Sequence, residues 1–318
     1  SIGRTLAALT EQVDPGEPFE VIVVDNGSED HTVQVVEGFL EKLPLKILSE
    51  PRPGKNAALN RALAEPLGEK VLFTDDDTLP APDWLLRMRA AFEAQPDFQM
   101  FGGAIRPEWP DGTPPAHVAK VPAGAAFVVT DERPSGPVEA ISLWGPNMGI
   151  RREVFYAGHR FSEQFGPRGR DYVMGGETEF TCRMAGQGLR AFWVADSRVG
   201  HIIRPEQLEL AWIHARAVRN GRSMFWFENA AHLRGEVPAL RVGRWRVRGV
   251  PLWMVQKYLA ARLASATARL GGDRATRFAH RWWAGYWEGY LGQAFRHARK
   301  MRTTVHEPPA EPPTASKG

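Results

Sequence analysis

Three adjacent acids, Asp75-Asp76-Asp77, follow the apolar run VLFT and are the residues of this chain best suited to chemistry. Neighbouring carboxylates repel one another, so they are stable together where a cation shares the site. Mg²⁺ and Mn²⁺ prefer carboxylate and phosphate oxygens as ligands. Alternate residues of a strand point to one side, which would place Asp75 and Asp77 together. A solvated acidic turn is the alternative, because DDDTLPAP is also typical of a turn.

Further acids stand where elements begin or end. Asp25 closes the β-branched run VIVV, and Glu177 and Glu179 open the segment GGETEF. A carboxylate near a substrate hydroxyl can take its proton as a general base. His201 follows a predicted strand, where a neutral imidazole can complete a metal site.

The elements around these residues alternate between strands and helices. We expect helices over 1–12, 32–42, 55–65, 82–95 and 175–188, and strands over 19–25, 45–50, 70–77, 101–106, 125–130 and 189–196. This alternation predicts an α/β fold, a mostly parallel sheet flanked by helices, with a C-terminal helical extension. Ligands of such sheets bind beyond the carboxyl ends of the strands, where the acids stand.

Five segments in a fixed order resemble the family-2 inverting glycosyltransferases of GT-A fold. They are VVDNGSEDHT, PGKNAALNRAL, FTDDDTLPAPDWL, GPNMGIRREVF and GGETEFTCRM, and the resemblance covers about residues 1–205. The resemblance implies a metal-dependent transfer of a sugar from a nucleotide-sugar donor to a hydroxyl of a sugar or lipid-linked acceptor. It also implies Mg²⁺ or Mn²⁺ as the cofactor and a role in polysaccharide or glycolipid assembly.

The resemblance assigns a role to each motif position. The donor is expected to contact Asp25, Asn26, Lys55, Asn56, Asp75 and Asp76, and the metal to contact Asp77, Asp75 and His201. Glu177 is the expected base and Glu179 the second candidate, although the family's usual Glu-Asp pair is absent here.

Four residues are predicted to contact the substrates outside the acidic motifs. Asn147 and Trp144 are assigned to the acceptor pocket, with turn-making and core packing as their alternatives. Arg204 and Arg219, or Arg216 on the same helix as Arg219, are assigned to the diphosphate as cations.

Charge divides the chain into two parts. Residues 1–205 carry a net charge of −8 and residues 206–302 a net charge of +12, with seven of the eleven tryptophans in the second part. Residues 274–302 place Phe278, Trp282, Tyr286 and Tyr290 at four-residue spacing. This pattern predicts a packed helix, with a dimer contact or a membrane-surface contact through 250–302 as alternatives. No nucleic-acid partner is expected, because no recognised module accompanies the charge.

These observations give four predicted regions. Residues 1–100 form the nucleotide-sugar-binding half, 101–205 the acceptor half with the base, 206–302 the basic aromatic extension, and 303–318 a disordered tail. The family's first strand is missing from 1–100, so we expect that Ser1 is not the natural start. A single cysteine and the lack of a long apolar run favour the cytoplasm, with the inner face of the cell membrane as an alternative.

Two other functions fit the same residues. A nucleotidyltransferase can use a similar sheet and metal. A catalytically silent module that binds nucleotide sugar or a membrane partner is the alternative outside enzymes.

Overall fold

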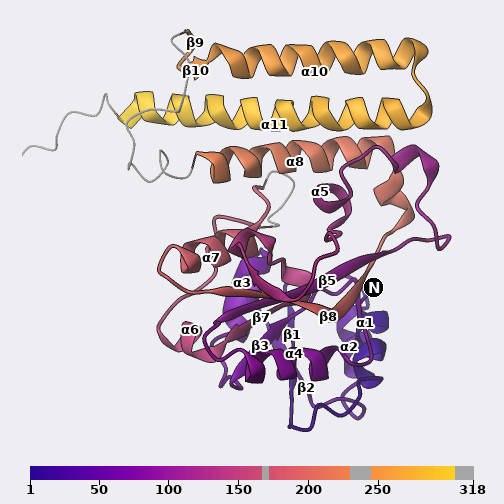
Figure 1. Ribbon diagram of the computed structural model, residues 1–318, viewed down its shortest axis with the longest axis vertical. Helices are drawn as coiled ribbons and strands as arrows, with labels where there is room; N and C mark the ends of the chain where they lie inside the picture. The colour runs from indigo at the N-terminus through magenta and orange to yellow at the C-terminus, as the bar shows by residue number, and fades with distance from the viewer. Residues whose placement is uncertain (167–171, 230–244, 305–318) are drawn as a thin grey trace, which may run out of the picture.

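A computed structural model describes residues 1–166, 172–229 and 245–304 of the chain. An α/β unit carries a layer of long C-terminal helices on one side (Figure 1). The fold class predicted from the sequence is confirmed. Among the described residues, no helix combines the length and the apolar character needed to cross a membrane.

The helices and strands follow the predicted alternation. The helices are α1 (Ile2–Thr10), α2 (Thr32–Glu37), α3 (Lys55–Ala62), α4 (Trp84–Ala94), α5 (Ala123–Phe127), α6 (Arg152–Tyr156), α7 (Gly176–Ala185), α8 (Leu210–Glu228), α10 (Leu252–Gly271) and α11 (Arg274–Thr304). The strands are β1 (Val21–Asp25), β2 (Leu45–Ser49), β3 (Lys70–Phe73), β4 (Thr78–Pro80), β5 (Met100–Glu108), β6 (Gly136–Val138), β7 (Met148–Arg151), β8 (Ala191–Ile202), β9 (Arg246–Val247) and β10 (Val250–Pro251).

The central sheet is mixed, which corrects the expectation that it is mostly parallel. Its order is β3-β7-β5-β8-β4, with β6 also on β8, and only the β5–β8 pair is parallel. A separate parallel pair joins β1 to β2. β1 and β3 each have one edge without a strand partner in the described part of the chain.

Two apolar clusters cover the faces of the six-stranded sheet, because neighbouring residues of a strand point to opposite sides. On one face Met100 and Trp193 pack with α6 and α7. On the other face Phe101 and Val194 pack with α1 and α4. These layers fix the strand ends that carry the acids.

Two predicted strands are wrong. Residues 125–127 belong to α5, which is followed by Val128 in a left-handed conformation, and residues 128–130 form no strand. The strand predicted over 70–77 ends at Phe73, so the three acids lie in the turn between β3 and β4. Asp75 and Asp77 are therefore placed by a turn and not by strand alternation.

The long C-terminal helices are stacked one on another beyond the sheet (Figure 1). α8 lies on the α/β unit, α11 packs against α8, and α10 packs against α11. Phe278, Trp282 and Tyr290 of α11 are at most 5% exposed. The aromatic stripe is therefore a packed helix face, as the sequence favoured. Of the predicted tail 303–318, residues 303 and 304 end α11, and 305–318 lie outside the described residues.

Glycines allow α8 and α11 to approach closely. A Cβ at Gly221 would clash with the carbonyl group of Tyr286, and one at Gly289 would clash with the carbonyl group of Val218. Both obstacles are backbone atoms, which cannot move without shifting a helix.

Gly221→Ala should lower the free energy of unfolding by about 3 kcal/mol, because the added methyl forces two packed helices apart. Gly292→Ala is the matched control, since a Cβ there meets nothing within 4 Å. That change should be neutral or stabilising by up to about 1 kcal/mol. Chemical denaturation measures both. Equal stability of the two variants would show that the glycine contact is unimportant.

Candidate active site

The turn after β1 is tied to the loop that leads into α3. Asn26 donates its amide hydrogens to the carbonyl groups of Glu50 (2.6 Å) and Arg52 (2.7 Å). Its amide oxygen accepts from the N–H of Gly54 at 2.7 Å. Asn26 therefore positions the backbone just before Lys55 and leaves Asp25 at the end of β1. The role that the sequence gave Asn26 beside the donor reduces here to shaping this loop.

Asp25 itself is only half-buried and holds its own turn. Its carboxylate accepts from the N–H of Ser28 at 3.1 Å. Hydrogen bonds from Ser28 lower the pKa of Asp25, although slight burial opposes them. The group is ionised at neutral pH and can accept hydrogen bonds from a ligand.

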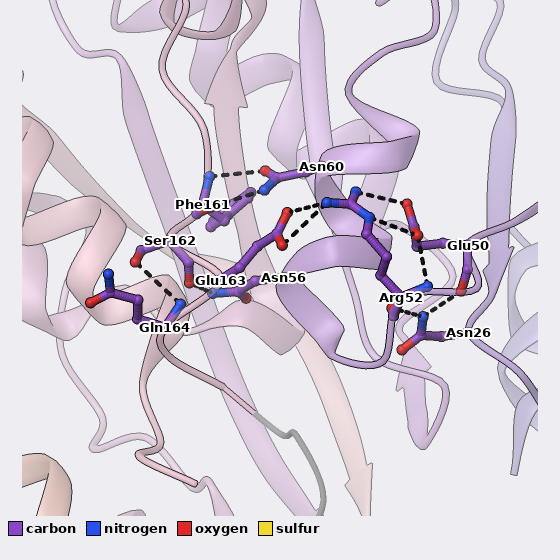
Figure 2. A network of polar contacts seen from close by, with 9 residues as sticks. All are labelled: Asn26, Glu50, Arg52, Asn56, Asn60, Phe161, Ser162, Glu163 and Gln164. Atoms are coloured by element: carbon purple, nitrogen blue, oxygen red, sulfur yellow. Dashed lines mark hydrogen bonds and ion pairs between the residues drawn. The ribbon is translucent and has the colours of Figure 1, made fainter.

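Polar side chains join α3 to the segment 161–164 (Figure 2). Asn60 exchanges hydrogen bonds with the backbone of Phe161, and Asn56 donates to the carbonyl of Ser162 at 2.7 Å. Arg52 forms ion pairs with Glu50 (2.9 Å) and Glu163 (3.1 Å). These contacts hold the segment 161–164 against α3, and Asn56 also packs against Gly176 at the start of α7.

Lys55 stands between two carboxylates from distant parts of the chain. Its ammonium nitrogen is 2.6 Å from Asp75 Oδ1 and 2.5 Å from Glu177 Oε1. The Lys55, Asp75 and Glu177 side chains are 28%, 25% and 14% exposed. The structure therefore brings together Lys55, which is predicted to contact the nucleotide-sugar donor, Asp75 of the acidic turn, and the predicted base Glu177.

Burial and charge act oppositely on these groups. Burial disfavours the charged form of Lys55, but Asp75 and Glu177 outweigh it and raise the lysine pKa. Burial would raise the pKa of Glu177, and Lys55 reverses this and lowers it. The pKa of Asp75 stays raised by burial despite Lys55, because Glu177 and Asp77 add like charge. Of the two carboxylates, Glu177 is the one whose ionised form is favoured overall, as a general base requires.

A second group contains Asp77, His201 and Arg204. Asp77 Oδ1 is 3.6 Å from His201 Nε2, and Asp77 Oδ2 is 3.6 Å from Arg204 Nη1. Burial opposes ionisation of Asp77, but the nearby imidazole of His201 and the charge of Arg204 lower its pKa overall. β4 pairs Thr78 with His201 in register, which explains why Asp77 faces the imidazole.

Asp77 and His201 together form a donor set that fits Mn²⁺. A carboxylate oxygen and an imidazole nitrogen are both ligands for that ion. The described residues contain no cluster of three or more His, Cys, Asp and Glu side chains able to hold a metal. His201 Nδ1 is buried without a hydrogen-bond partner in the same part of the chain. Asp75, the third predicted metal ligand, is turned to Lys55 instead.

Three other predicted site residues bind protein groups. Asp76 is exposed and accepts from the Ser1 hydroxyl at 2.9 Å. Glu179 pairs with Arg183 at 2.8 Å along the helix, so it is not aimed at Lys55. Asn56 is 1% exposed and packs against Gly176, where a Cβ would clash with its amide. Asn56 therefore acts on the site by holding the start of α7.

Trp144 precedes Gly145, the residue on which the predicted base Glu177 packs. Glu177 packs on Gly145, where a Cβ would lie 2.5 Å from Glu177 Oε1. The Trp144 indole is half-buried and donates to the carbonyl group of Ile141 at 3.1 Å. Its prediction as an acceptor contact is consistent with this position next to Glu177.

Asn147, by contrast, is a structural residue, and its predicted contact with the acceptor is wrong. Its side chain is fully buried and donates to the carbonyl groups of Ala104 and Ser197, both at 3.0 Å. Its amide oxygen accepts from Trp84 Nε1 (2.9 Å) and the Ser197 hydroxyl (3.2 Å). The pairing of β5 with β8 shifts register between Gly103 and Ala104, and Asn147 satisfies the backbone there.

Cations of α8 complete the surroundings of the site. Arg216 donates to the carbonyl group of Ala125 at 3.1 Å. Burial lowers the pKa of Arg216 to about 10, while Tyr172, Asp77 and Glu177 oppose that fall. Arg219 lies over the Tyr172 ring at 5.4 Å. Arg216, the alternative to Arg219, is thus the α8 arginine whose pKa responds to both Asp77 and Glu177. Sequence reasoning missed Tyr172, because it belongs to no recognised motif.

The first half of the chain matches a known protein family. The family model "Glycosyl transferase family 2" matches residues 1–158. These residues are a family-2 glycosyltransferase domain. The prediction of a family-2 glycosyltransferase is confirmed for residues 1–158.

Two relatives from Haloferax volcanii align over long stretches. Glucosyl-dolichyl phosphate glucuronosyltransferase is 26% identical over 217 residues, 65% of this chain and 66% of the relative. Glycosyltransferase AglE is 26% identical over 268 residues, 81% of this chain and 77% of the relative. Among solved structures, the mannosyltransferase PcManGT from Pyrobaculum calidifontis, in complex with GDP-Man and Mn²⁺, has a TM-score of 0.55 at 22% identity. The alignment covers 96% of this chain and 84% of that one, which shows the GT-A fold.

Asn147→Ala should lower the free energy of unfolding by about 3 kcal/mol, because it leaves buried donors and acceptors at the register shift without partners. Urea denaturation with and without the substitution measures this loss. An unchanged stability together with weaker acceptor binding would restore the predicted contact with the acceptor.

Proposed function

We propose that this chain transfers a sugar from a nucleotide-sugar donor to a hydroxyl group of its acceptor, with inversion at the anomeric carbon. The proposal rests on two clusters of charged residues that suit different steps of the reaction. Asp75 and Glu177 share Lys55, while Asp77 lies against His201 and Arg204. One group suits proton abstraction and the other suits binding of a leaving diphosphate.

Glu177 is the proposed base. It is ionised and 14% exposed, and it stands in the first turn of α7. An acceptor hydroxyl that displaces Lys55 from Glu177 Oε1 would give its proton to that oxygen as the new glycosidic bond forms. Loss of the Lys55 contact raises the proton affinity of the carboxylate at that moment, which favours the transfer.

Asp77 and His201 are the proposed protein ligands of a divalent metal, with Asp75 beside them. A bound Mn²⁺ or Mg²⁺ supplies positive charge that stabilises the departing diphosphate. Arg204 and the arginines Arg216 and Arg219 add cations from the protein. The choice of Mn²⁺ over Mg²⁺ follows from the imidazole nitrogen in the donor set.

The donor nucleotide is proposed to lie along the ends of β1 and β3. Asp25 accepts hydrogen bonds there, and Asp75 and Asp76 follow β3. Asn26 and Asn56 hold the loop and helix start that present Lys55. Fixed backbone at such a site keeps the orientation cost of binding low.

The acceptor is proposed to be a sugar hydroxyl on a lipid-linked or polymeric carrier, entering beside Trp144. The name of the Haloferax volcanii relative, which includes glucosyl-dolichyl phosphate, supports a lipid-linked acceptor. Assembly of such carriers fits a cytoplasmic protein working at the inner face of the cell membrane, and we propose that location.

Glu177→Gln should leave nucleotide-sugar binding unchanged and lower turnover by about a thousandfold, because only the base is lost. Glu179→Gln is the matched control, and its turnover should stay near that of the parent chain because Glu179 pairs with Arg183. A panel of UDP- and GDP-sugars with Mn²⁺, followed by thermal shift and by release of nucleoside diphosphate, measures both steps.

Asp77→Ala, measured in the same experiment, distinguishes the role of the metal ligand from that of the base. It should abolish the Mn²⁺-dependent part of the thermal shift. Full activity of both Glu177→Gln and Asp77→Ala would contradict the proposed roles. Release of pyrophosphate in place of a nucleoside diphosphate would indicate nucleotidyl transfer.

A further inference from the structure

A cavity lined by arginines lies far from the acids, where the end of α10, the start of α11 and the start of α8 meet. Its volume is about 280 Å³. Phe278 and Leu210 provide apolar lining, and the remaining wall is mostly Arg269, Arg274, Arg277 and Arg281. The known and proposed steps of sugar transfer use none of these residues.

No ion pair within 4.0 Å joins these four guanidinium groups to a carboxylate of the described residues, although Glu288, which pairs with His214, acts on Arg281 from further away. The acid nearest in sequence, Asp273, is bound by Lys120 (3.3 Å) and by Thr276. Burial and then the charge of Arg269 lower the pKa of Arg281, which shows that like charges crowd this cavity. Residues 245–282 contain eight Lys or Arg and one acid, so the surrounding surface is strongly basic. An arginine cluster of this kind is suited to phosphate oxygens.

An apolar stripe runs along the same helix. Leu259, Leu263 and Leu270 are 58%, 67% and 91% exposed, at spacings that place them on one face of α10. Arg262 and Arg269 are exposed beside this stripe, and α10 contains no acidic residue. α10 is also the outermost layer of the molecule (Figure 1).

The charge pattern decides between two occupants of this face. A second copy of the chain would bring the same cations against one another, because a two-fold contact joins identical patches. An anionic bilayer supplies phosphate groups for the arginines and an acyl region for the leucines. The lipid surface is the occupant that complements both features.

We propose that the cavity binds the phosphate head group of an anionic lipid while the exposed leucines of α10 enter the bilayer interface. α10 then lies flat on the membrane, and α11 and α8 hold the sugar-transfer site above it. This inference stands on the C-terminal helices alone and does not depend on the proposed transfer reaction.

Flotation of the full chain with vesicles tests the proposal. Vesicles of phosphatidylcholine with about 30% phosphatidylglycerol should carry the protein, and vesicles of phosphatidylcholine alone should not. Arg274→Gln with Arg277→Gln should weaken binding roughly thirtyfold, from about 1 kcal/mol for each cation at the surface. The matched control removes two exposed arginines of the α/β unit, Arg87 and Arg198, as glutamines, and should change binding little. Equal losses in both double variants would overturn the proposal in favour of general electrostatic attraction.

A second pair of variants separates the lipid from soluble and protein partners. Leu263→Ser with Leu270→Ser should lose vesicle binding and retain binding of glycerol 3-phosphate, measured by calorimetry. Binding of glycerol 3-phosphate without any vesicle binding by the parent chain would identify a soluble phosphate ligand and overturn the proposal. A parent dimer that these serines dissociate, measured by ultracentrifugation, would do the same in favour of a second copy.

Discussion

The ammonium group of Lys55 joins two carboxylates that the chain supplies from the end of β3 and the start of α7, Asp75 and Glu177. Each carboxylate alone would be costly to bury, and removing one partner of such a cluster leaves an uncompensated charge. The cation therefore ties the donor half of the site to the half that holds the base. It also fixes their charge states, since Glu177 remains ionised while the pKa of Asp75 is raised.

Several glycines and amide side chains allow the end of β3 and the start of α7 to approach Lys55 closely. Gly145 and Gly176 leave room for Glu177 and for Asn56, which could not approach a side chain at these positions. Asn26 holds the backbone before Lys55 in the same way. The glycines thus leave space for close contact at the site, and the amide side chains hold it through hydrogen bonds to the backbone. These contacts fix the arrangement of the site residues, which suits a reaction that requires alignment of three groups.

Sequence reasoning identified the acids but not the way in which the backbone presents them. The order of the motifs placed Asp77 and His201 in one site, and the β4–β8 register brings their side chains within 3.6 Å. Sequence could not show that β3 stops at Phe73, because Thr74 to Asp77 is equally compatible with a strand.

Asn147 and the C-terminal aromatics show a different limit. Asn147 sits in a turn-like GPN segment, yet its partners are created by a register shift between β5 and β8, which no local pattern encodes. The stripe of α11 has the same period whether it meets lipid or protein. Only Gly221 of α8 and Gly289 of α11, each of which admits the backbone of the other helix, distinguish the two, and their meaning depends on knowing which helices are neighbours.

The pKa of Glu177, followed by carbon-detected NMR of labelled glutamate with Glu177→Gln for assignment, tests the central claim most directly. In the parent chain it should lie below the ordinary value of 4.5, because Lys55 outweighs burial. In Lys55→Met it should rise above that value, since burial remains and the compensating charge is gone. The same pKa in both proteins would contradict the account, because the base would then owe its ionisation to something other than Lys55.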